Sequence, residues 1–298
     1  MKVKIIFSIL ILLLLFIPFG YVIYIYADSY DQLKNLKEYK PQLATKIFDR
    51  NGKLISELFE EKRDYVKINK IPVNVKQAFL AAEDKNFYKH TGIDIIGIVR
   101  AIIVDLVSGR MKQGGSTITQ QLAKQLYTNR SRTIRRKVVE LLFAFELEKK
   151  YSKNKILEMY LNQIYFGHGL YGIESAARFY LKKTVNDITP IEAALLASIP
   201  TAPNKYSPIR NPRRAYERHK KIIYNMINEG YIDKTTASQK FNTFWMKILP
   251  DFAVRFASKG VMYKNFDNAP HVTEYIRRLL VKQLGKNKVY NGGLKIYT

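Results

Sequence analysis

The feature that most constrains this chain is an uninterrupted apolar run over residues 5–27, close to the first methionine. At about 1.5 Å per residue, a helix of this length crosses the ~30 Å hydrocarbon core of a bilayer. Pro18 and Gly20 would be unfavourable in a soluble helix but are tolerated in a membrane helix. A cleaved signal peptide is the alternative, although its apolar stretch is usually shorter and no A-x-A site follows here. We therefore predict an uncleaved membrane anchor within residues 1–27.

The charge of the chain indicates which partners it can have. Lys and Arg number 50 against 25 Asp and Glu, a net charge of +25, and there is no cysteine. This excess favours nucleic acid, anionic lipid or phosphate-bearing substrates. A short basic N-terminus before a first span favours a cytoplasmic N-terminus and an extracytoplasmic remainder, where lipid head groups and lipid-linked phosphates are present and nucleic acid is not. Without cysteine, disulfides and thiolate metal sites are excluded.

Beyond the anchor, the pattern predicts a small amount of β structure. Two apolar runs flank Asn51-Gly52 within residues 45–59, which is a strong hairpin signal. Near the end of the chain, two glycines lead into a second expected β element over 293–298. Since a strand needs a partner, either it pairs with the hairpin or the sequence is a piece of a longer protein.

Helical periodicity, punctuated by glycine and proline, dominates the middle of the chain and makes the expected fold class mainly α. Helices are expected over residues 74–86, 94–108, 116–127, 133–150, 153–164, 170–181, 189–198 and 211–229, with one more over 271–285. We therefore expect a linker with the hairpin over residues 28–64, a helical domain over 65–245 and a final linker segment over 246–298.

The segment AAEDKNFYKHTG contains the first candidate for chemistry. Helical spacing places Glu83 near Phe79 and Phe87 on one face. A carboxylate among apolar side chains is partly desolvated, which makes it a better base or acid. The alternative is a surface glutamate near a helix end with Asp84 as a solvated neighbour, and this segment alone leaves both interpretations open.

The segment QGGSTITQQLAKQLY is a candidate anion site. Gly114 and Gly115 supply a flexible approach, and Ser116 or Thr117 supplies an N-cap. The helix that follows presents polar side chains near its start: Gln120, Gln121 and Lys124. Free amides at a helix N-terminus, with a lysine one turn on, suit a phosphate. The G-x-x-x-x-G-K-[ST] spacing of a P-loop is absent, and an ordinary capped helix explains the pattern equally well.

The segment RSRTIRRKVVELLFAFELEKK places a glutamate among cations. An apolar stripe at helical spacing predicts that one face is core: Ile134, Val138, Leu141, Leu142 and Phe145. The opposite face is also apolar and carries Glu140, which needs partners if it is buried. Arg136 and Lys137 lie four and three residues before it, and Arg132 and Arg135 add charge upstream. Structural ion pairing and catalysis remain equally open for Glu140.

Together these segments supply two carboxylates, nearby cations and a helix N-terminus. Such a set suits transfer of a glycosyl group from a phosphate leaving group. One carboxylate removes the proton of the attacking hydroxyl, and the cations take up the charge that develops on the leaving phosphate.

Two apolar segments remain. Residues 93–107 are too short to span a bilayer, and we expect them to dip into the membrane interface, with a core helix as the alternative. Residues 158–169 are interpreted as core that ends in a C-cap turn.

In this order, the segments resemble the motifs of the bacterial peptidoglycan glycosyltransferases, family 51. The family pattern E-D-x-x-F-x-x-H-x-G matches residues 83–92, G-G-S-T-I-T-Q-Q matches 114–121, and R-K-x-x-E matches 136–140. The segments YLNQIYFGHGLYGIESAARFY and AALLASIPTAPNKYSP also resemble family motifs. The likeness covers residues 45–230.

The resemblance implies a lysozyme-like helical fold with a membrane-facing lobe that contains residues 93–107. The implied partners are lipid II, a disaccharide-pentapeptide on undecaprenyl pyrophosphate, and the growing glycan chain. By carry-over, Glu83 is the base that deprotonates the acceptor 4-hydroxyl, the donor is inverted, and Glu140 supports the site. Lys124, Arg132 and Lys137 are expected to hold the donor's pyrophosphate. The remaining expected substrate-binding residues are Asp84, Gly115, Ser116, Thr117, Gln121 and Arg136.

Class A penicillin-binding proteins continue from such a module into a serine acyltransferase domain. No K-T-G motif occurs here, the S-x-x-K match at Ser152 and Lys155 is fortuitous, and residues 257–298 resemble the linker into that domain. We therefore expect the sequence to be a truncated class A protein in the bacterial inner membrane.

The pattern requires no cofactor, and it is compatible with an accessory divalent cation near the pyrophosphate. Membrane lipids are expected partners, whereas protein partners cannot be read from the sequence. A lysozyme-like lytic enzyme and a non-enzymatic basic scaffold are the alternatives. The cationic segments disfavour the lytic enzyme, because cleavage of a neutral glycan needs no groups that bind a pyrophosphate.

Overall fold

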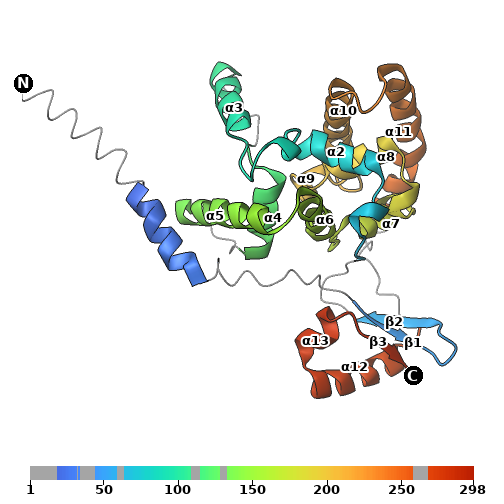
Figure 1. Cartoon of the computed structure of the whole chain (residues 1–298). Helices are drawn as coiled ribbons and strands as arrows, with labels where there is room; N and C mark the ends of the chain where they lie inside the picture. Colours follow the sequence, from blue (N-terminus) through green and yellow to red (C-terminus); the bar gives the residue numbers. More distant parts are fainter. Residues whose placement is uncertain are drawn as a thin grey trace, which may run out of the picture. The chain divides into compact units, whose positions relative to one another are not determined.

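A computed structural model describes residues 19–31, 33, 44–58, 64–108, 115–127, 133–257 and 268–298. These residues form two compact units. The first is built from the described parts of 1–39 and 87–156, and the second from the described parts of 40–86 and 157–298. Each unit is described below by itself (Figure 1).

The expected anchor lies largely outside the described residues. Its last part belongs to a helix over residues 19–31, and residues 5–18 are not described. Within the described ranges, no helix has the length and apolar character needed to cross a bilayer.

In the first unit, helices α4 and α5 pack side by side (Figure 1). The unit's principal helices are α3 (Ile95–Ser108), α4 (Ile118–Tyr127) and α5 (Ile134–Lys150). Helix α4 buries Leu122 and Ala123, and the rings of Tyr127 and Phe143 stack with centroids 4.3 Å apart. Apolar packing between the two helices therefore holds α4 in place beside α5.

The predicted core face of α5 is wrong. The buried residues of this helix are Glu140, Phe143, Ala144 and Leu147, whereas Ile134 is 77% exposed and Phe145 is 45% exposed. Helix α4 packs against the side of α5 that carries the glutamate. The other stripe residues, Val138, Leu141 and Leu142, are only half-buried. Periodicity marks an apolar face without showing what covers it.

In the second unit, helix α8 (Pro190–Ser198) is the centre of the helical core. All its residues from Ile191 to Ser198 are buried, as expected for a helix that is apolar all round. Thr189 and Glu192 form a capping box that fixes its start. Helices α2 (Val73–Glu83), α10 (Pro212–Asn228) and α11 (Lys234–Ala257) pack against it. The remaining helices of this core are α6 (Lys153–Gln163), which continues from the first unit, α7 (Ile173–Leu181) and α9 (Pro203–Tyr206).

The second unit also contains a small module made from two distant parts of the sequence, residues 44–58 and 268–298. Strands β1 (Thr45–Phe48) and β2 (Leu54–Leu58) form the predicted hairpin, with Gly52 at a φ of 78° in its turn. Strand β3 (Lys295–Tyr297) pairs in parallel with β1, giving the strand order β2-β1-β3. Helices α12 (Pro270–Leu284) and α13 (Lys286–Asn291) complete the module. Of the two alternatives for the last strand, pairing with the hairpin is confirmed.

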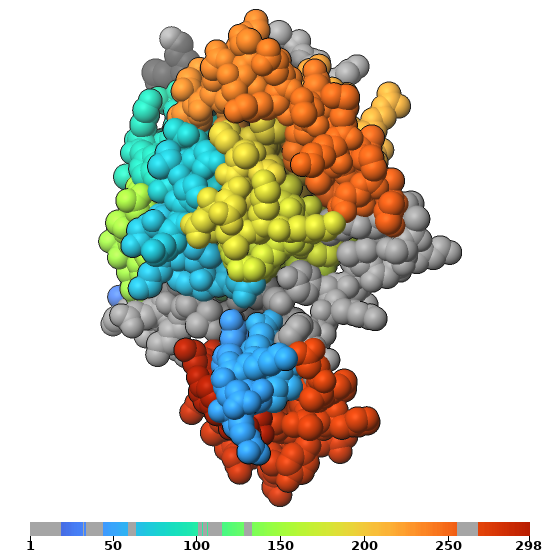
Figure 2. All heavy atoms as spheres, turned by 90° about the vertical axis from the view of Figure 1, so that its right-hand side faces the viewer, coloured from blue at the N-terminus to red at the C-terminus, as the bar shows by residue number. Residues whose placement is uncertain are grey.

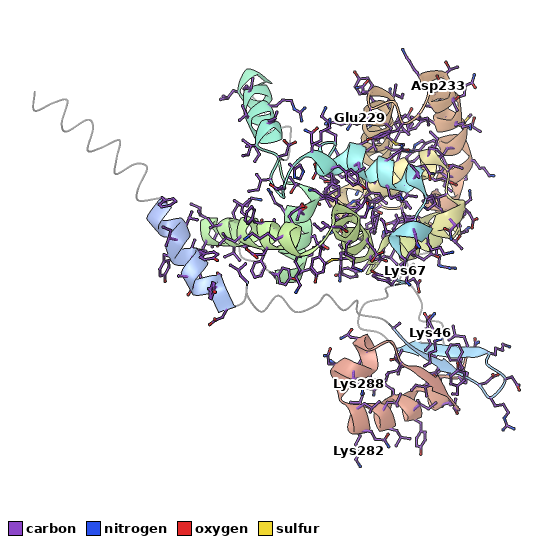
Figure 3. The ribbon with its side chains drawn as sticks, viewed as in Figure 1. Lys46, Lys67, Glu229, Asp233, Lys282 and Lys288 are labelled. Carbon is purple, nitrogen blue, oxygen red and sulfur yellow. The ribbon has the colours of Figure 1, made fainter. Side chains whose placement is uncertain are left out.

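The core of this module comes from both ends of the described chain. Ile47, Leu58 and Val289 are buried together, and residues of α12 pack against them. The space-filling view shows the hairpin (blue) against residues 268–298 (red) (Figure 2). Its surface is basic, with Lys46, Lys282 and Lys288 on the outside (Figure 3).

Candidate functional site

Glu83 is the last residue of α2, and its carboxylate accepts a hydrogen bond from a threonine that is itself bonded to α10. Thr201, in the turn after α8, donates a hydrogen bond from Oγ1 to Glu83 Oε1 at 2.7 Å. Arg218 of α10 donates from Nη2 to the same Thr201 oxygen at 3.0 Å. Glu83 is half-buried, so it combines partial desolvation with a defined hydrogen-bond partner.

The neighbours of Glu83 are a buried acid and a buried phenol. Asp84 follows the helix end and is buried. Burial raises the pKa of the Tyr160 phenol well above its ordinary value of 10, and the charges of Glu83 and Asp84 raise it further. Tyr160 therefore stays protonated at neutral pH. Glu83 is thus a half-buried carboxylate with Tyr160 as a core neighbour.

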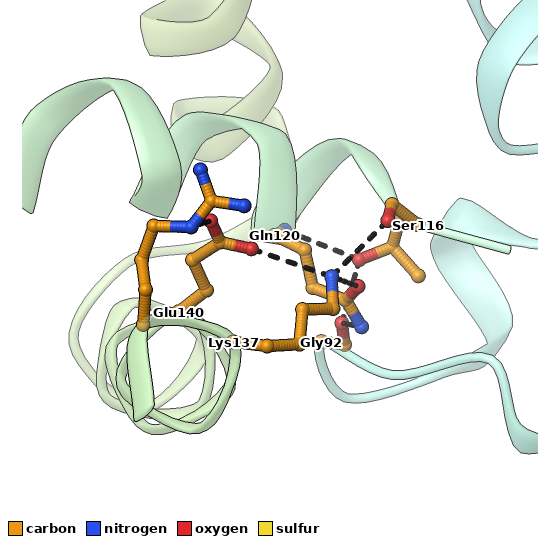
Figure 4. Close-up of polar contacts among 7 residues, drawn as sticks. Gly92, Ser116, Gln120, Lys137 and Glu140 are labelled. Atoms are coloured by element: carbon orange, nitrogen blue, oxygen red, sulfur yellow. Dashed lines mark hydrogen bonds and ion pairs between the residues drawn. The ribbon is translucent and has the colours of Figure 1, made fainter. Parts of the chain in front are cut away.

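In the first unit, Lys137 is the hub of a polar cluster at the start of α4 (Figure 4). Its Nζ lies 3.2 Å from Ser116 Oγ, 3.4 Å from Gln120 Oε1 and 3.3 Å from Glu140 Oε2. The side chain of Lys137 is 46% exposed, whereas that of Glu140 is 4% exposed. A cation held at the surface by three oxygen atoms can contact an anion from solvent without moving far.

Glu140 is a buried carboxylate with two cationic partners, as its position in the sequence predicts. Arg136 Nε lies 3.2 Å from Glu140 Oε1, and Lys137 lies on the other oxygen. Arg136 Nε and Glu140 Oε1 form no hydrogen bond with any group in the described part of the chain. Their contact is therefore an ion pair without good hydrogen-bond direction. Removing one cation would leave the buried carboxylate with a single partner.

Thr117, one of the two predicted caps, is the residue that caps α4. Its Oγ1 accepts a hydrogen bond from Gln120 N at 3.2 Å and donates to Gly92 O at 2.6 Å. Gln120 Nε2 also reaches Gly92 O, at 3.4 Å. Gly92 has a φ of 91° and lies so close to α5 that an added Cβ would be 3.3 Å from Ala144 O. The end of the first motif is thereby fixed to the start of the second.

The other predicted substrate-binding residues are placed as follows. Gly115 is exposed just before the cap, Gln121 is half-buried in the first turn of α4, and Lys124 is exposed one turn on. Arg132 lies outside the described residues. No group of three or more His, Cys, Asp or Glu side chains within the described ranges could hold a metal ion.

Three residues of the site make contacts that were not predicted from the sequence. Gln120 stands in a predicted motif, but its double role between Lys137 and Gly92 depends on the packing of α4. Thr201 and Arg218 lie far from Glu83 in sequence, and no local spacing pattern could have signalled that Thr201 contacts Glu83 or that Arg218 contacts Thr201.

Comparisons with known proteins match this chain to one family. The transglycosylase family model matches residues 51–227. Penicillin-binding protein 1A of Aquifex aeolicus (strain VF5) is 42% identical over 265 residues, covering 89% of this chain and 35% of that protein. Penicillin-binding protein 1F of Bacillus subtilis (strain 168) is 45% identical over 218 residues, covering 73% of this chain and 30% of that protein.

Among solved structures, the 2.6 Å crystal structure of penicillin-binding protein 1A from Haemophilus influenzae aligns with a TM-score of 0.44 and 25% identity, over 88% of this chain and 27% of that one. The chain thus spans about a third of the length of the relatives that it matches.

Proposed function

This chain belongs to the transglycosylase family, and from that premise we propose that it is a peptidoglycan glycosyltransferase that polymerises lipid II into glycan strands. The observation that carries the proposal is the cluster in which Lys137 lies within 3.4 Å of Ser116, Gln120 and Glu140. A surface cation beside the first turn of a helix suits a phosphate-bearing leaving group. A neutral glycan would have no use for it.

In the proposed reaction, Glu83 takes the proton of the acceptor's 4-hydroxyl. The freed oxygen attacks the anomeric carbon of the donor chain while the bond from that carbon to the pyrophosphate breaks, so the configuration inverts. The proton on Glu83 then passes to water. The half-buried position of Glu83 supports this role because partial desolvation favours proton uptake.

The leaving pyrophosphate takes the bonding electrons and gains negative charge. Among the residues that the structure describes, we assign Lys137 as the principal partner of the leaving pyrophosphate. Lys124 and Arg132 are assigned as further contacts. Glu140 and Arg136 keep Lys137 in position through the paired carboxylate. The assignments of Asp84, Gly115, Ser116, Thr117 and Gln121 as substrate-binding residues, and of an accessory divalent cation at the pyrophosphate, are part of the same proposal.

The membrane is the proposed site of action. In α3, Ile95, Ile96, Val99, Ile103 and Leu106 are exposed, and they recur at helical spacing. The stripe of α5 that begins at Ile134 belongs to the same unit. We propose that these faces contact the membrane interface. A single-pass anchor within residues 1–27, with a cytoplasmic N-terminus in the bacterial inner membrane, would hold the catalytic part at that surface.

The test is polymerisation of purified lipid II by the full chain and by Glu83→Gln, with Glu217→Gln at an exposed position of α10 as the matched control. Wild type and the control should form glycan polymer, and Glu83→Gln should lose at least a hundredfold in rate, the lower range for removing a general base. Retention of activity by Glu83→Gln would refute the assignment of the base. Cleavage of preformed glycan without polymer formation would instead support a lytic enzyme.

A further inference from the structure

Thr201 stands between the proposed base and a cation. Its hydroxyl donates to Glu83 Oε1 at 2.7 Å and accepts from Arg218 Nη2 at 3.0 Å. We propose that Thr201 is a positioning residue for Glu83 and that Arg218 acts on the carboxylate through it. This inference rests on the proposed function, since it assigns a task to groups that support the proposed base.

The direction of each hydrogen bond follows from the chemistry of the three groups. A guanidinium can only donate and an ionised carboxylate can only accept, whereas a hydroxyl can do both at once. Arg218 therefore occupies a lone pair of Thr201, and the single hydroxyl proton is directed to Glu83. Two hydrogen bonds in series also polarise one another, which makes the hydroxyl a stronger donor to the carboxylate.

We call the hydrogen-bonded series Arg218–Thr201–Glu83 the relay. Its two ends, Arg218 and Glu83, are anchored in the helical core of the second unit. Asn225 Nδ2 donates to Ala81 O at 2.9 Å and so ties α10 to the last turn of α2. The turn that presents Thr201 closes with a hydrogen bond from Ala202 N to the carbonyl of Ile199, which is fully buried. The relay thus joins three elements that already pack on one another.

Arg218 is itself restrained. Its guanidinium carbon lies 5.7 Å from the centre of the Tyr206 ring, and its Nε is buried without a hydrogen bond to any described group. The next residue, His219, is fully buried. Arg218 is half-buried, and Thr201 is the polar contact to which its Nη2 donates.

The consequence for catalysis is orientation. A glutamate at a helix end has several rotamers of similar energy, and only some of them present a carboxylate oxygen to the acceptor hydroxyl. Holding Oε1 with Thr201 fixes where Oε2 points. A positioned base speeds the chemical step and leaves substrate affinity nearly unchanged, so loss of the relay should lower kcat and not KM.

Steady-state polymerisation of lipid II by the full chain tests this in Thr201→Val, Thr201→Ser and Arg218→Gln. Thr201→Val keeps the branched shape and removes the hydroxyl, and we expect kcat to fall about tenfold with KM within about twofold. Thr201→Ser restores the hydroxyl and should recover most of the rate. Because Arg218 acts through Thr201, Arg218→Gln should lower kcat in the wild type but have little further effect in the Thr201→Val background.

Two matched controls separate positioning from general damage. Thr243→Val removes an exposed hydroxyl that donates to Gln239 O of its own helix at 3.0 Å, and Arg213→Gln removes an exposed charge from the start of α10. Both should match wild type, and thermal melts should show that every variant is folded.

Three outcomes would overturn the inference: an unchanged kcat in Thr201→Val, failure of Thr201→Ser to recover, or additive effects in the double variant. If wild type polymerises lipid II and Glu83→Gln does not, such an outcome removes only the role of Thr201 and Arg218. If wild type forms no polymer, the proposed function itself fails.

Discussion

His219 shows how a single buried side chain can couple helix packing to pH. It is fully buried in α10, and its Nε2 lies 2.9 Å from the carbonyl of Ile191 in α8. Trp245 of α11 donates from Nε1 to His219 Nδ1 at 3.0 Å. Because the indole can only donate, Nδ1 is the acceptor, and Nε2 carries the proton that is shared with Ile191. The neutral ring therefore links three helices.

Burial lowers the pKa of His219 from 6.5 to about 3. The unfolded chain binds a proton at this residue below pH 6.5, whereas the folded chain does so only near pH 3. Protonation therefore favours unfolding in that window, and stability should fall as the pH decreases. Between pH 7.5 and 5, the contribution of this group to the free energy of unfolding should drop by about 2 kcal/mol.

Urea unfolding of wild type and His219→Gln at the two pH values measures this term. The variant should be less stable at pH 7.5 but lose about 2 kcal/mol less than wild type on acidification. Carboxylates that titrate in the same range are common to both proteins and cancel in the difference. Equal losses in the two proteins would mean that His219 can be protonated in the folded state.

At this scale, the sequence predicts a residue well when its partners are close in the chain. Helical spacing places Arg136 and Lys137 beside Glu140, for which ion pairing was one of two open interpretations, and both cations do pair with it. Thr201 could not be found in this way, since it lies 118 residues from Glu83. Its contact depends on how α8 and α10 pack against α2, which no local pattern encodes.

The helices themselves were largely predictable, and their faces were not. The expected helices at 74–86, 133–150 and 211–229 correspond to α2, α5 and α10 within three residues at each end. Proline and glycine account for much of this agreement, because they interrupt helices for backbone reasons. The stripe of α5 was misassigned because periodicity marks an apolar face without showing what covers it.

Helix α3 allows that distinction to be tested. Ile96 and Leu106 are each 77% exposed, and we propose that they enter the membrane interface. The chain has no cysteine, so Ile96→Cys can be labelled at one position with a polarity-sensitive fluorophore. After reconstitution into liposomes, its emission should shift to the blue relative to detergent-free, lipid-free protein, because the probe enters an apolar medium.

Met246→Cys is the matched control for this measurement. Met246 is an exposed apolar residue of α11, in the second unit, and is 72% exposed. The emission of a fluorophore at this position should stay unshifted when the protein is reconstituted into liposomes, because the label remains in water. Identical spectra from the two labelled positions would contradict a membrane role for α3 and favour an unpartnered surface helix.

On the scale of the whole molecule, the small module brings together segments more than 200 residues apart. Thr45 Oγ1 accepts a hydrogen bond from Leu294 N across 249 positions, and Phe48 stacks on Tyr297 with ring centroids 5.2 Å apart. The hairpin and the final strand were both expected from turn residues and alternation. Pairing of the last strand with the hairpin was one of two alternatives, and its parallel orientation was not predicted, because a strand needs a partner but its sequence does not show which one.

The module has its own core, so we expect it to unfold without the helical core of the second unit. Val289 is fully buried between the sheet and α12. Val289→Asp would remove apolar burial that contributes about 2 kcal/mol and would place a carboxylate where no partner was provided. Limited proteolysis should then cut within residues 44–58 and 268–298 at least tenfold faster, since local opening exposes those segments.

Leu284→Asp, at an exposed position of α12, should leave the cleavage pattern unchanged. None of the proposed site residues lies in the module, so Val289→Asp should still polymerise lipid II. The contradicting result is a Val289→Asp protein whose helical core melts as in wild type but which no longer polymerises lipid II. That result would make the module part of the catalytic machinery.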